Sequence, residues 1–311
     1  MTDMWQAKQI MMNGQLMPFN DARLHPLSLA VAYATTVFEG IRAYHNPKTG
    51  SFSIFRLAEH IQRLQVGIKL LRMERTYELD YLTDCLTRLI RANEPDDDVY
   101  IRLLVYIEGI GLMATQGPVG FTAAAMPREK SKFVETGMSL GVSSWNRLAD
   151  NASPPRIKTT ANYHNARLTQ LQARADGYDG ALMLTSSGRV SEAPIACFFM
   201  VRDGKLITPS LTSNILESIT RDTIIALYRD LTGREVEQRE VDRSELYFAQ
   251  EAFLCGTGQE INPVVSIDRL AVGDGAVGPV TQLLKQRYFE VVRGLTADYA
   301  HWRTVVALGG P

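Results

Sequence analysis

The sequence predicts an α+β fold in two domains, and three observations lead to this prediction. The chain has 311 residues, which is enough to bury two separate hydrophobic cores. Hydrophobic residues make up 45% of it and charged residues 22%, as is ordinary for a globular protein. Short strands in hairpin arrangements are mixed with strands connected by helices, and this mixture favours α+β over a doubly wound parallel sheet.

Turn signals and periodicity define the elements of the first half of the chain. Residues 9–18 consist of two short apolar runs around Asn13-Gly14, a turn pair typical of a β-hairpin. Residues 37–44 form the next expected strand, built around Gly40, where the backbone can approach a ligand closely. The remaining elements expected here are a strand at residues 53–56, helices at 57–71 and 81–92, and strands at 99–107 and 121–126.

A charged, proline-led stretch at residues 127–132 indicates a linker between the domains. We therefore predict an N-terminal α+β domain at residues 1–126, a linker at 127–136 and a C-terminal domain at 137–311. The elements expected in the C-terminal domain are strands at residues 138–142, 180–185 and 196–202, and helices at 164–176, 221–231 and 280–295.

Charge and residue usage exclude several classes of function. The formal net charge of −1 provides no field that would attract nucleic acid or an anionic membrane. No apolar run is long enough to span a bilayer or to serve as a signal peptide. The three cysteines (Cys85, Cys197 and Cys255) lie far apart, and the five histidines show no metal-ligand spacing. We expect a cytoplasmic protein without a metal, a nucleic-acid partner or a membrane partner.

A single lysine, Lys158, stands between a turn-forming run at residues 151–155 and the helix expected at 164–176. The residues on one face of that helix are Leu168, Leu171, Gln172 and Ala175. If this face packs inward, Lys158 lies close to the core, its pKa falls, and its amine becomes a usable nucleophile. The alternative is a lysine at a strand end whose ammonium reaches water, and spacing alone favours this alternative.

Three further positions could carry chemistry, and each has an ordinary structural alternative. Glu192 precedes an apolar strand, and a carboxylate buried there needs a partner, either a protonated pyridine nitrogen or an arginine. Ser218 and Thr220 are suitable N-caps for the following helix, whose first N–H groups could bind a phosphate. The turn at residues 256–258, Gly-Thr-Gly, could present a hydroxyl and N–H groups to an anion, or it could be a plain glycine turn.

Together these positions match a known family. The chain resembles the branched-chain amino acid aminotransferases, members of the fold-type IV pyridoxal-phosphate enzymes, from about Asn13 to Tyr288. The motifs that carry the resemblance are Val37-Phe38-Glu39-Gly40-Ile41-Arg42, Ser143-Ser144-Trp145-Asn146-Arg147, Lys158 with Asn162-Tyr163, Ser191-Glu192, Ile219-Thr220-Arg221-Asp222, and Gly256-Thr257 followed by Glu260 and Pro263-Val264. The resemblance implies a smaller N-terminal α/β domain, and a larger C-terminal cofactor-binding domain with a mixed, barrel-like sheet. It also implies a homodimer in which a loop of one subunit closes the active site of the other.

By this resemblance the cofactor is pyridoxal 5′-phosphate, and Lys158 is the lysine that forms a Schiff base with it and shuttles a proton. Glu192 resembles the partner of the pyridine nitrogen, and Tyr163 resembles the tyrosine that hydrogen-bonds the phenolate oxygen. Leu216 matches the leucine that packs on the ring. The residues that resemble the phosphate site are Arg56, Ile219, Thr220 and Thr257.

The resemblance also implies a substrate pocket. Its residues are Phe38, Gly40, Arg42, Tyr100, Arg102 and Gly258. Arg102 is the natural ligand of the α-carboxylate, because a guanidinium binds a carboxylate through two parallel hydrogen bonds. Several places depart from the family pattern. Residues 256–259 read Gly-Thr-Gly-Gln for Gly-Thr-Ala-Ala, residues 192–197 read Glu-Ala-Pro-Ile-Ala-Cys for Glu-Gly-x-Gly-Glu-Asn, Leu103 replaces a proline, and residues 127–132 lack a pocket tyrosine.

The function that the resemblance implies is a ping-pong exchange of the amino group of L-leucine, L-isoleucine or L-valine with 2-oxoglutarate. The departures leave two alternatives in the same fold: a transaminase of (R)-amines or D-amino acids, and an aminodeoxychorismate lyase. A non-catalytic cofactor-binding or interaction protein is a further hypothesis. The intact set of Lys158, Tyr163 and Glu192 argues against it.

Overall fold

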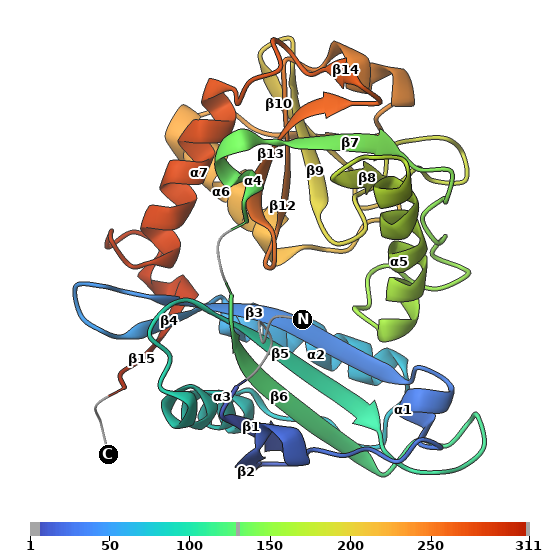
Figure 1. Ribbon diagram of the computed structural model, residues 1–311, viewed down its shortest axis with the longest axis vertical. Coiled ribbons are helices and arrows are strands. Elements are labelled where there is room, and N and C mark those ends of the chain that lie inside the picture. Colours follow the sequence, from blue (N-terminus) through green and yellow to red (C-terminus); the bar gives the residue numbers. More distant parts are fainter. Residues whose placement is uncertain (1–6, 129–130, 309–311) are drawn as a thin grey trace. The chain divides into compact units, whose positions relative to one another are not determined.

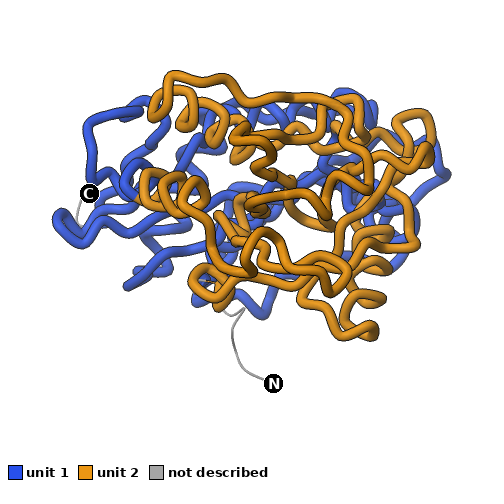
Figure 2. The backbone as a smooth tube through the Cα atoms, turned by 90° about the horizontal axis from the view of Figure 1, so that it is seen from above, with its two compact units in different colours: residues 1–129, 157–161, 290–311 blue, residues 130–156, 162–289 orange. Residues whose placement is uncertain are grey.

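The computed structural model describes residues 7–128 and 131–308, and these contain two β-sheets with accompanying helices (Figure 1). Two compact units are present (Figure 2): residues 1–129, 157–161 and 290–311 belong to the first unit, and residues 130–156 and 162–289 to the second. The predicted α+β class is confirmed. Residues 129 and 130 of the predicted linker lie outside the described residues. The domain boundaries drawn from the sequence stay a prediction.

The first unit is built on an antiparallel sheet whose described strands have the order β15-β4-β3-β5-β6-β1-β2. The strands are β1 (Gln9–Met12), β2 (Gln15–Pro18), β3 (Thr36–His45), β4 (Phe52–Phe55), β5 (Val99–Ile107), β6 (Val119–Pro127) and β15 (Arg303–Val306); the helices are α1 (Leu29–Ala32), α2 (Leu57–Leu70), α3 (Leu79–Asn93) and the 3₁₀ helices η1 (Phe19–Asp21) and η3 (Ala300–Trp302). The β1–β2 hairpin confirms the predicted turn, because Asn13 and Gly14 have φ angles of 52° and 86°. Both angles are left-handed, as a tight two-residue hairpin turn requires.

The strands β3 and β5, near the middle of this sheet, turn one face to a hydrophobic core and a second face away from it. Their odd-numbered residues, such as Val37, Ile41 and Ile101, lie in a hydrophobic core with residues of α2 and α3. Side chains alternate across a strand, so the even-numbered residues of β3 and β5 project from the second face. This alternation decides which side chains of the motif at residues 37–42 are kept out of the core.

The second unit contains a mixed sheet whose described strands have the order β11-β10-β9-β12-β13-β7-β8, with β14 paired to β13. The strands are β7 (Met138–Val142), β8 (Gly180–Leu182), β9 (Cys197–Arg202), β10 (Lys205–Pro209), β11 (Glu237–Arg239), β12 (Glu251–Gly256), β13 (Glu260–Ile267) and β14 (Leu270–Ala271); the helices are α4 (Phe133–Thr136), α5 (Thr160–Ala175), α6 (Ile219–Thr232), α7 (Pro279–Val292) and the 3₁₀ helix η2 (Arg243–Phe248). The first two residues of α5 belong to the first unit. No helix among the described residues is long and apolar enough to cross a membrane.

The inward face predicted for α5 is wrong. Leu171 is 45% exposed, whereas the buried residues of the helix are Asn162, Ala166, Thr169 and Ala173. Asn162 accepts a hydrogen bond from the Ser153 hydroxyl and donates one to the carbonyl of Pro154 at 2.9 Å. Its buried amide is therefore satisfied, and the small side chains along the same face allow close packing. Small size and hydrogen bonding, rather than hydrophobicity, select this face.

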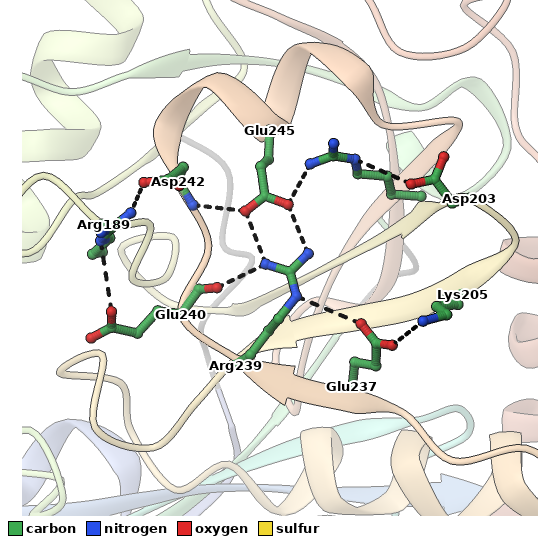
Figure 3. Close-up of polar contacts among 9 residues, drawn as sticks. Arg189, Asp203, Lys205, Glu237, Arg239, Glu240, Asp242 and Glu245 are labelled. Atoms are coloured by element: carbon green, nitrogen blue, oxygen red, sulfur yellow. Dashed lines mark hydrogen bonds and ion pairs between the residues drawn. The ribbon is translucent and has the colours of Figure 1, made fainter.

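An ion-pair network connects η2 to the strands at one edge of the second sheet (Figure 3). The carboxylate of Glu245, in η2, accepts hydrogen bonds from Arg239 of β11 at 2.7 Å and from Arg202 of β9 at 2.5 Å. The bonds from Arg239 lower the pKa of Glu245. The Glu245 side chain is only 13% exposed, so this network is screened less than an isolated surface pair. We assign it a structural role, since every charge in it has a partner.

Candidate active site

Lys158 is attached to β3 through its backbone. The N–H of Phe38 donates a hydrogen bond to the carbonyl of Lys158 at 2.9 Å, and the hydroxyl of Thr159 donates one to the carbonyl of Thr36 at 2.8 Å. Lys158 is half-buried, and its Nζ atom lies 4.9 Å from the centroid of the Phe38 ring. The structure therefore places the lysine amine beside the ring of a residue predicted to contact substrate.

The predicted substrate residues of β3 and β5 share the second face of the sheet. Gly40 pairs directly with Arg102, and Arg42 pairs with Tyr100. The Arg102 side chain is exposed, and its Cζ atom lies 5.9 Å from the centroid of the Tyr100 ring. Arg42 is buried, and its Nη1 atom donates to the carbonyl of Arg128 at 3.3 Å. Two guanidinium groups and a phenol on one face form a surface that suits a carboxylate ligand.

Beneath these residues, on the core face of β3, lies a buried charged cluster that the sequence did not single out. Glu39 accepts hydrogen bonds from Nδ1 of His60 at 2.7 Å, and from Nε and Nη2 of Arg63, each at 2.7 Å. Burial alone would raise the pKa of the Glu39 carboxyl, but Arg63 and His60 together lower it to about 2. Burial lowers the pKa of His60. The cluster therefore combines a carboxylate, a guanidinium and a neutral imidazole, and it ties α2 to β3.

Arg56 stands at the junction between β4 and α2. Its backbone is left-handed, with φ 51° and ψ 42°, and the residue is buried. Its Nε atom donates to the Glu59 carboxylate at 2.6 Å, and its Cζ atom lies 4.7 Å from the centroid of the Trp302 ring. The guanidinium is therefore held from two directions at the start of a helix.

Glu192 is buried within the second unit, as the sequence predicted. Its Oε1 atom accepts a hydrogen bond from Nε of Arg147 at 2.9 Å, and its Oε2 atom accepts one from the backbone N–H of Leu216 at 3.2 Å. The thiol of Cys197 also donates to Oε2, at 3.8 Å. The arginine partner that the sequence left open is thus present. The contact with Leu216 brings together two residues predicted to bind the cofactor.

The remaining predicted residues of the second unit lie at the ends of regular elements. Tyr163 is half-buried in the first turn of α5. Thr220 and Ile219 begin α6, which Ser218 caps by accepting a hydrogen bond from the N–H of Arg221 at 3.2 Å. The first N–H groups of a helix have no partners within it and attract anions. Thr257 and Gly258 form the turn between β12 and β13.

Sequence reasoning missed two residues that hold predicted site residues in place. Arg147 closes the motif Ser143-Ser144-Trp145-Asn146-Arg147, so its position was visible, but no role was attached to it. Trp302, which contacts Arg56, lies far along the chain from its partner and belongs to no motif. Only the pairing of β15 with β4 brings it there.

Comparison with known proteins gives one consistent result. Residues 36–267 match the family described as Amino-transferase class IV. A probable branched-chain-amino-acid aminotransferase of Aquifex aeolicus is 37% identical over 297 residues, which cover 94% of this chain and 95% of that protein. The branched-chain-amino-acid aminotransferase of Escherichia coli (strain K12) is 38% identical over 304 residues, covering 96% of this chain and 97% of that protein.

A solved structure extends the similarity to the fold. The branched-chain amino acid aminotransferase from Thermobaculum terrenum, in its PLP form, superposes with a TM-score of 0.91 and 42% sequence identity, covering 97% of this chain and 99% of that one. This agreement also confirms the predicted fold-type IV architecture. The chain belongs to the class IV aminotransferases and, within them, to the branched-chain amino acid aminotransferases, as its motifs predicted.

Proposed function

We propose that this protein is a pyridoxal-phosphate-dependent transaminase. It exchanges the amino group of L-leucine, L-isoleucine or L-valine with 2-oxoglutarate by a ping-pong mechanism. The observation that carries this proposal is the similarity, over nearly the whole chain, to proteins named for this activity. The same similarity favours this reaction over an (R)-amine or D-amino acid transaminase and over a lyase.

The residues of this chain fit the cofactor. The Glu192 carboxylate is buried and oriented by Arg147 and Leu216, which suits a group that keeps a pyridine nitrogen protonated. The capped start of α6 offers N–H groups of the kind that bind phosphate. When bound, pyridoxal phosphate would supply an electrophilic carbon for an amine and a ring that accepts electrons from the substrate.

The chain's own residues would then act on the cofactor and the substrate in distinct ways. Lys158 would hold the cofactor through Nζ and later carry the proton that leaves the substrate Cα. Glu192 would keep the pyridine nitrogen protonated, and Tyr163 would donate a hydrogen bond to the phenolate oxygen. The residues proposed to hold the ring and the phosphate are Leu216 for the ring, and Arg56, Ile219, Thr220 and Thr257 for the phosphate.

The second face of the first sheet would bind the substrate. Arg102 would hold the α-carboxylate, because its exposed guanidinium can form two parallel hydrogen bonds. Arg42 and Tyr100 would add a second charge and a phenolic donor beside it. Phe38 would contact the aliphatic side chain of the amino acid, and Gly40 would leave the room that the Tyr100 hydroxyl occupies on this face. Gly258, in the turn between β12 and β13 of the second unit, is a further residue predicted to bind the substrate.

A single half-reaction tests the function. The purified enzyme, loaded with pyridoxal phosphate, is mixed separately with L-leucine, L-glutamate, D-alanine and (R)-1-phenylethylamine, and the cofactor absorbance is followed. We expect rapid conversion to the amino form of the cofactor by the two L-amino acids alone. Conversion by the D-amino acid or the (R)-amine instead would replace the proposed substrate class, and no conversion by any of them would refute transamination.

We also propose that the protein is a homodimer, as the sequence predicts. The cytoplasmic location predicted from the sequence is part of the same proposal. Exposed apolar side chains of the first unit support the dimer. With exposed fractions of 58–84%, they are Leu27, Val31, Ile110, Leu112 and Met113. The N–H of Leu29 donates to the carbonyl of Gly109 at 3.0 Å, which joins α1 to the segment after β5 (Figure 1). Large apolar side chains exposed on two neighbouring segments are typical of a surface that a second copy covers. Light scattering should report twice the chain mass, 34.7 kDa each.

A further inference from the structure

We infer that Trp302 is a positioning residue for Arg56 and thereby sets the affinity of the protein for the cofactor's phosphate. The inference rests on the proposed function, which assigns Arg56 to that phosphate. It concerns a residue close to the C-terminal end of the described chain, in η3, for which the motifs suggest no role.

The backbone of Arg56 adopts a conformation that its surroundings must hold. A φ of 51° lies in the left-handed region, which is unfavourable for a residue with a Cβ. The backbone N–H of Arg56 donates to the carbonyl of Trp302 at 2.6 Å. Because Arg303 pairs with Phe55 in the β15–β4 ladder, this bond extends the ladder by one residue. The segment carrying Trp302 thus fixes the turn from which the Arg56 side chain leaves.

The side chain of Arg56 is fixed by the same residue. Its guanidinium lies over the Trp302 ring, 4.7 Å from the centroid, while its Nε atom is bonded to Glu59 at 2.6 Å. An indole supports a guanidinium through its flat face, and the N–H groups of the guanidinium point outward in its plane. A contact with the face of the ring therefore restrains the guanidinium without competing for these donors. Both residues are only 8% exposed, so water screens the contact weakly.

Trp302 can position Arg56 only if its own ring is fixed, and two aromatic neighbours fix it. Its ring stacks on Tyr299 with the centroids 4.0 Å apart and the planes 19° from parallel. The edge of Phe55 meets it at 5.9 Å and 89°. The Arg56 guanidinium thus rests on a ring that two aromatic neighbours, Tyr299 and Phe55, hold in place. An arginine ordered before the anion arrives loses less side-chain entropy on binding, so preorganisation raises affinity.

The experiment separates a role in phosphate binding from a role in stability. The apo forms of the full-length wild type, Trp302→Leu, Trp302→Phe and Val306→Ala are titrated by equilibrium dialysis with pyridoxal phosphate, with pyridoxal, and with inorganic phosphate. Val306 is the matched control, because it is a buried residue of β15 paired with Phe52 and remote from the Arg56 guanidinium in the ladder. Thermal unfolding of each apo form is measured alongside.

We expect Trp302→Leu to weaken binding of pyridoxal phosphate and of inorganic phosphate about tenfold, with pyridoxal unchanged. Trp302→Phe should recover most of this loss, because it keeps a ring beneath the guanidinium. Val306→Ala should unfold at a lower temperature and bind all three probes as the wild type does. If Trp302→Leu does not fold, Tyr299→Leu takes its place and should give a smaller loss of the same kind.

Three outcomes would overturn the inference. One is a folded Trp302→Leu protein with wild-type affinity for pyridoxal phosphate. Another is an equal loss of pyridoxal and pyridoxal phosphate, and the third is the same phosphate-specific loss in Val306→Ala. A wild-type protein that binds neither pyridoxal nor pyridoxal phosphate would instead refute the proposed cofactor, so the two failures are distinguishable.

Discussion

The hydroxyl of Tyr100 lies over Gly40, in the space that a Cβ atom on Gly40 would occupy. The two residues come from neighbouring strands, and Gly40 pairs directly with Arg102, whose guanidinium is close to the same tyrosine ring. Because Gly40 has no side chain, the Tyr100 hydroxyl can lie over it. The Tyr100 ring in turn contacts the guanidinium of Arg102. Both are residues proposed to bind the substrate.

Gly40→Ala should displace Tyr100 and impair substrate binding. A methyl group at this position meets the tyrosine ring, and β3 cannot give way because its other face is packed in the core. We expect kcat/KM for L-leucine to fall on the order of tenfold to a hundredfold, mainly through KM, with cofactor affinity kept. Steady-state kinetics and cofactor titration measure the two quantities. In a protein that already carries Tyr100→Ala, Gly40→Ala should change kcat/KM little further. If kcat/KM falls there as much as in the wild type, displacement of Tyr100 is not the cause.

Local signals account for most of what the sequence predicted correctly. The Asn13-Gly14 pair requires two left-handed residues and so fixes the first hairpin, and the apolar alternation of β5 sets its bounds at Val99 and Ile107 as predicted. Lys158 and Glu192 were singled out by their position between turns and apolar segments. The residues alone leave a functional and a structural role open at each position, and only the resemblance decides between them.

What the sequence could not predict depends on contacts between distant residues. Nothing in the spacing of Glu192 shows that Arg147 is its partner, because that pair forms only when two loops of the second unit meet. The same holds for Trp302 and Arg56. The error at α5 has another cause: its buried face is built from small and polar residues such as Ala166 and Thr169, which a search for apolar periodicity passes over.

The cluster around Glu39 should make stability depend on pH in a defined direction. Below about pH 6.5 the unfolded chain protonates His60, and below about 4.5 it protonates Glu39, whereas the folded chain, with lowered pKa values, takes up neither proton until lower pH. The unfolded state then binds more protons, so the free energy of unfolding falls as the pH falls. For Glu39 the difference between 4.5 and about 2 corresponds to roughly 3 kcal/mol.

Glu39→Gln tests this assignment by denaturant unfolding of the apo protein at several pH values. At pH 7 the variant should be less stable by about 3–5 kcal/mol, because the Arg63 guanidinium loses its buried partner. The gap to the wild type should narrow as the pH drops below about 4.5 and the wild-type carboxylate loses its advantage. Glu135→Gln is the control: it removes an 80% exposed carboxylate paired with Lys285, and should change little. A gap that stays constant down to low pH would disprove the charged state assigned to Glu39.

The pair of Arg147 and Glu192 allows stability and catalysis to be separated. Both side chains are buried, so Arg147→Met leaves a carboxylate without its ionic partner and should cost about 3–5 kcal/mol in the free energy of unfolding. Adding Glu192→Gln to Arg147→Met removes the buried negative charge, so the double variant should recover most of the lost stability. The double variant should nevertheless convert L-leucine in the half-reaction much more slowly than the wild type, because an amide cannot keep the pyridine nitrogen protonated. If the double variant regains both stability and rate, Glu192 serves only to neutralise Arg147, and the proposed role in cofactor binding fails.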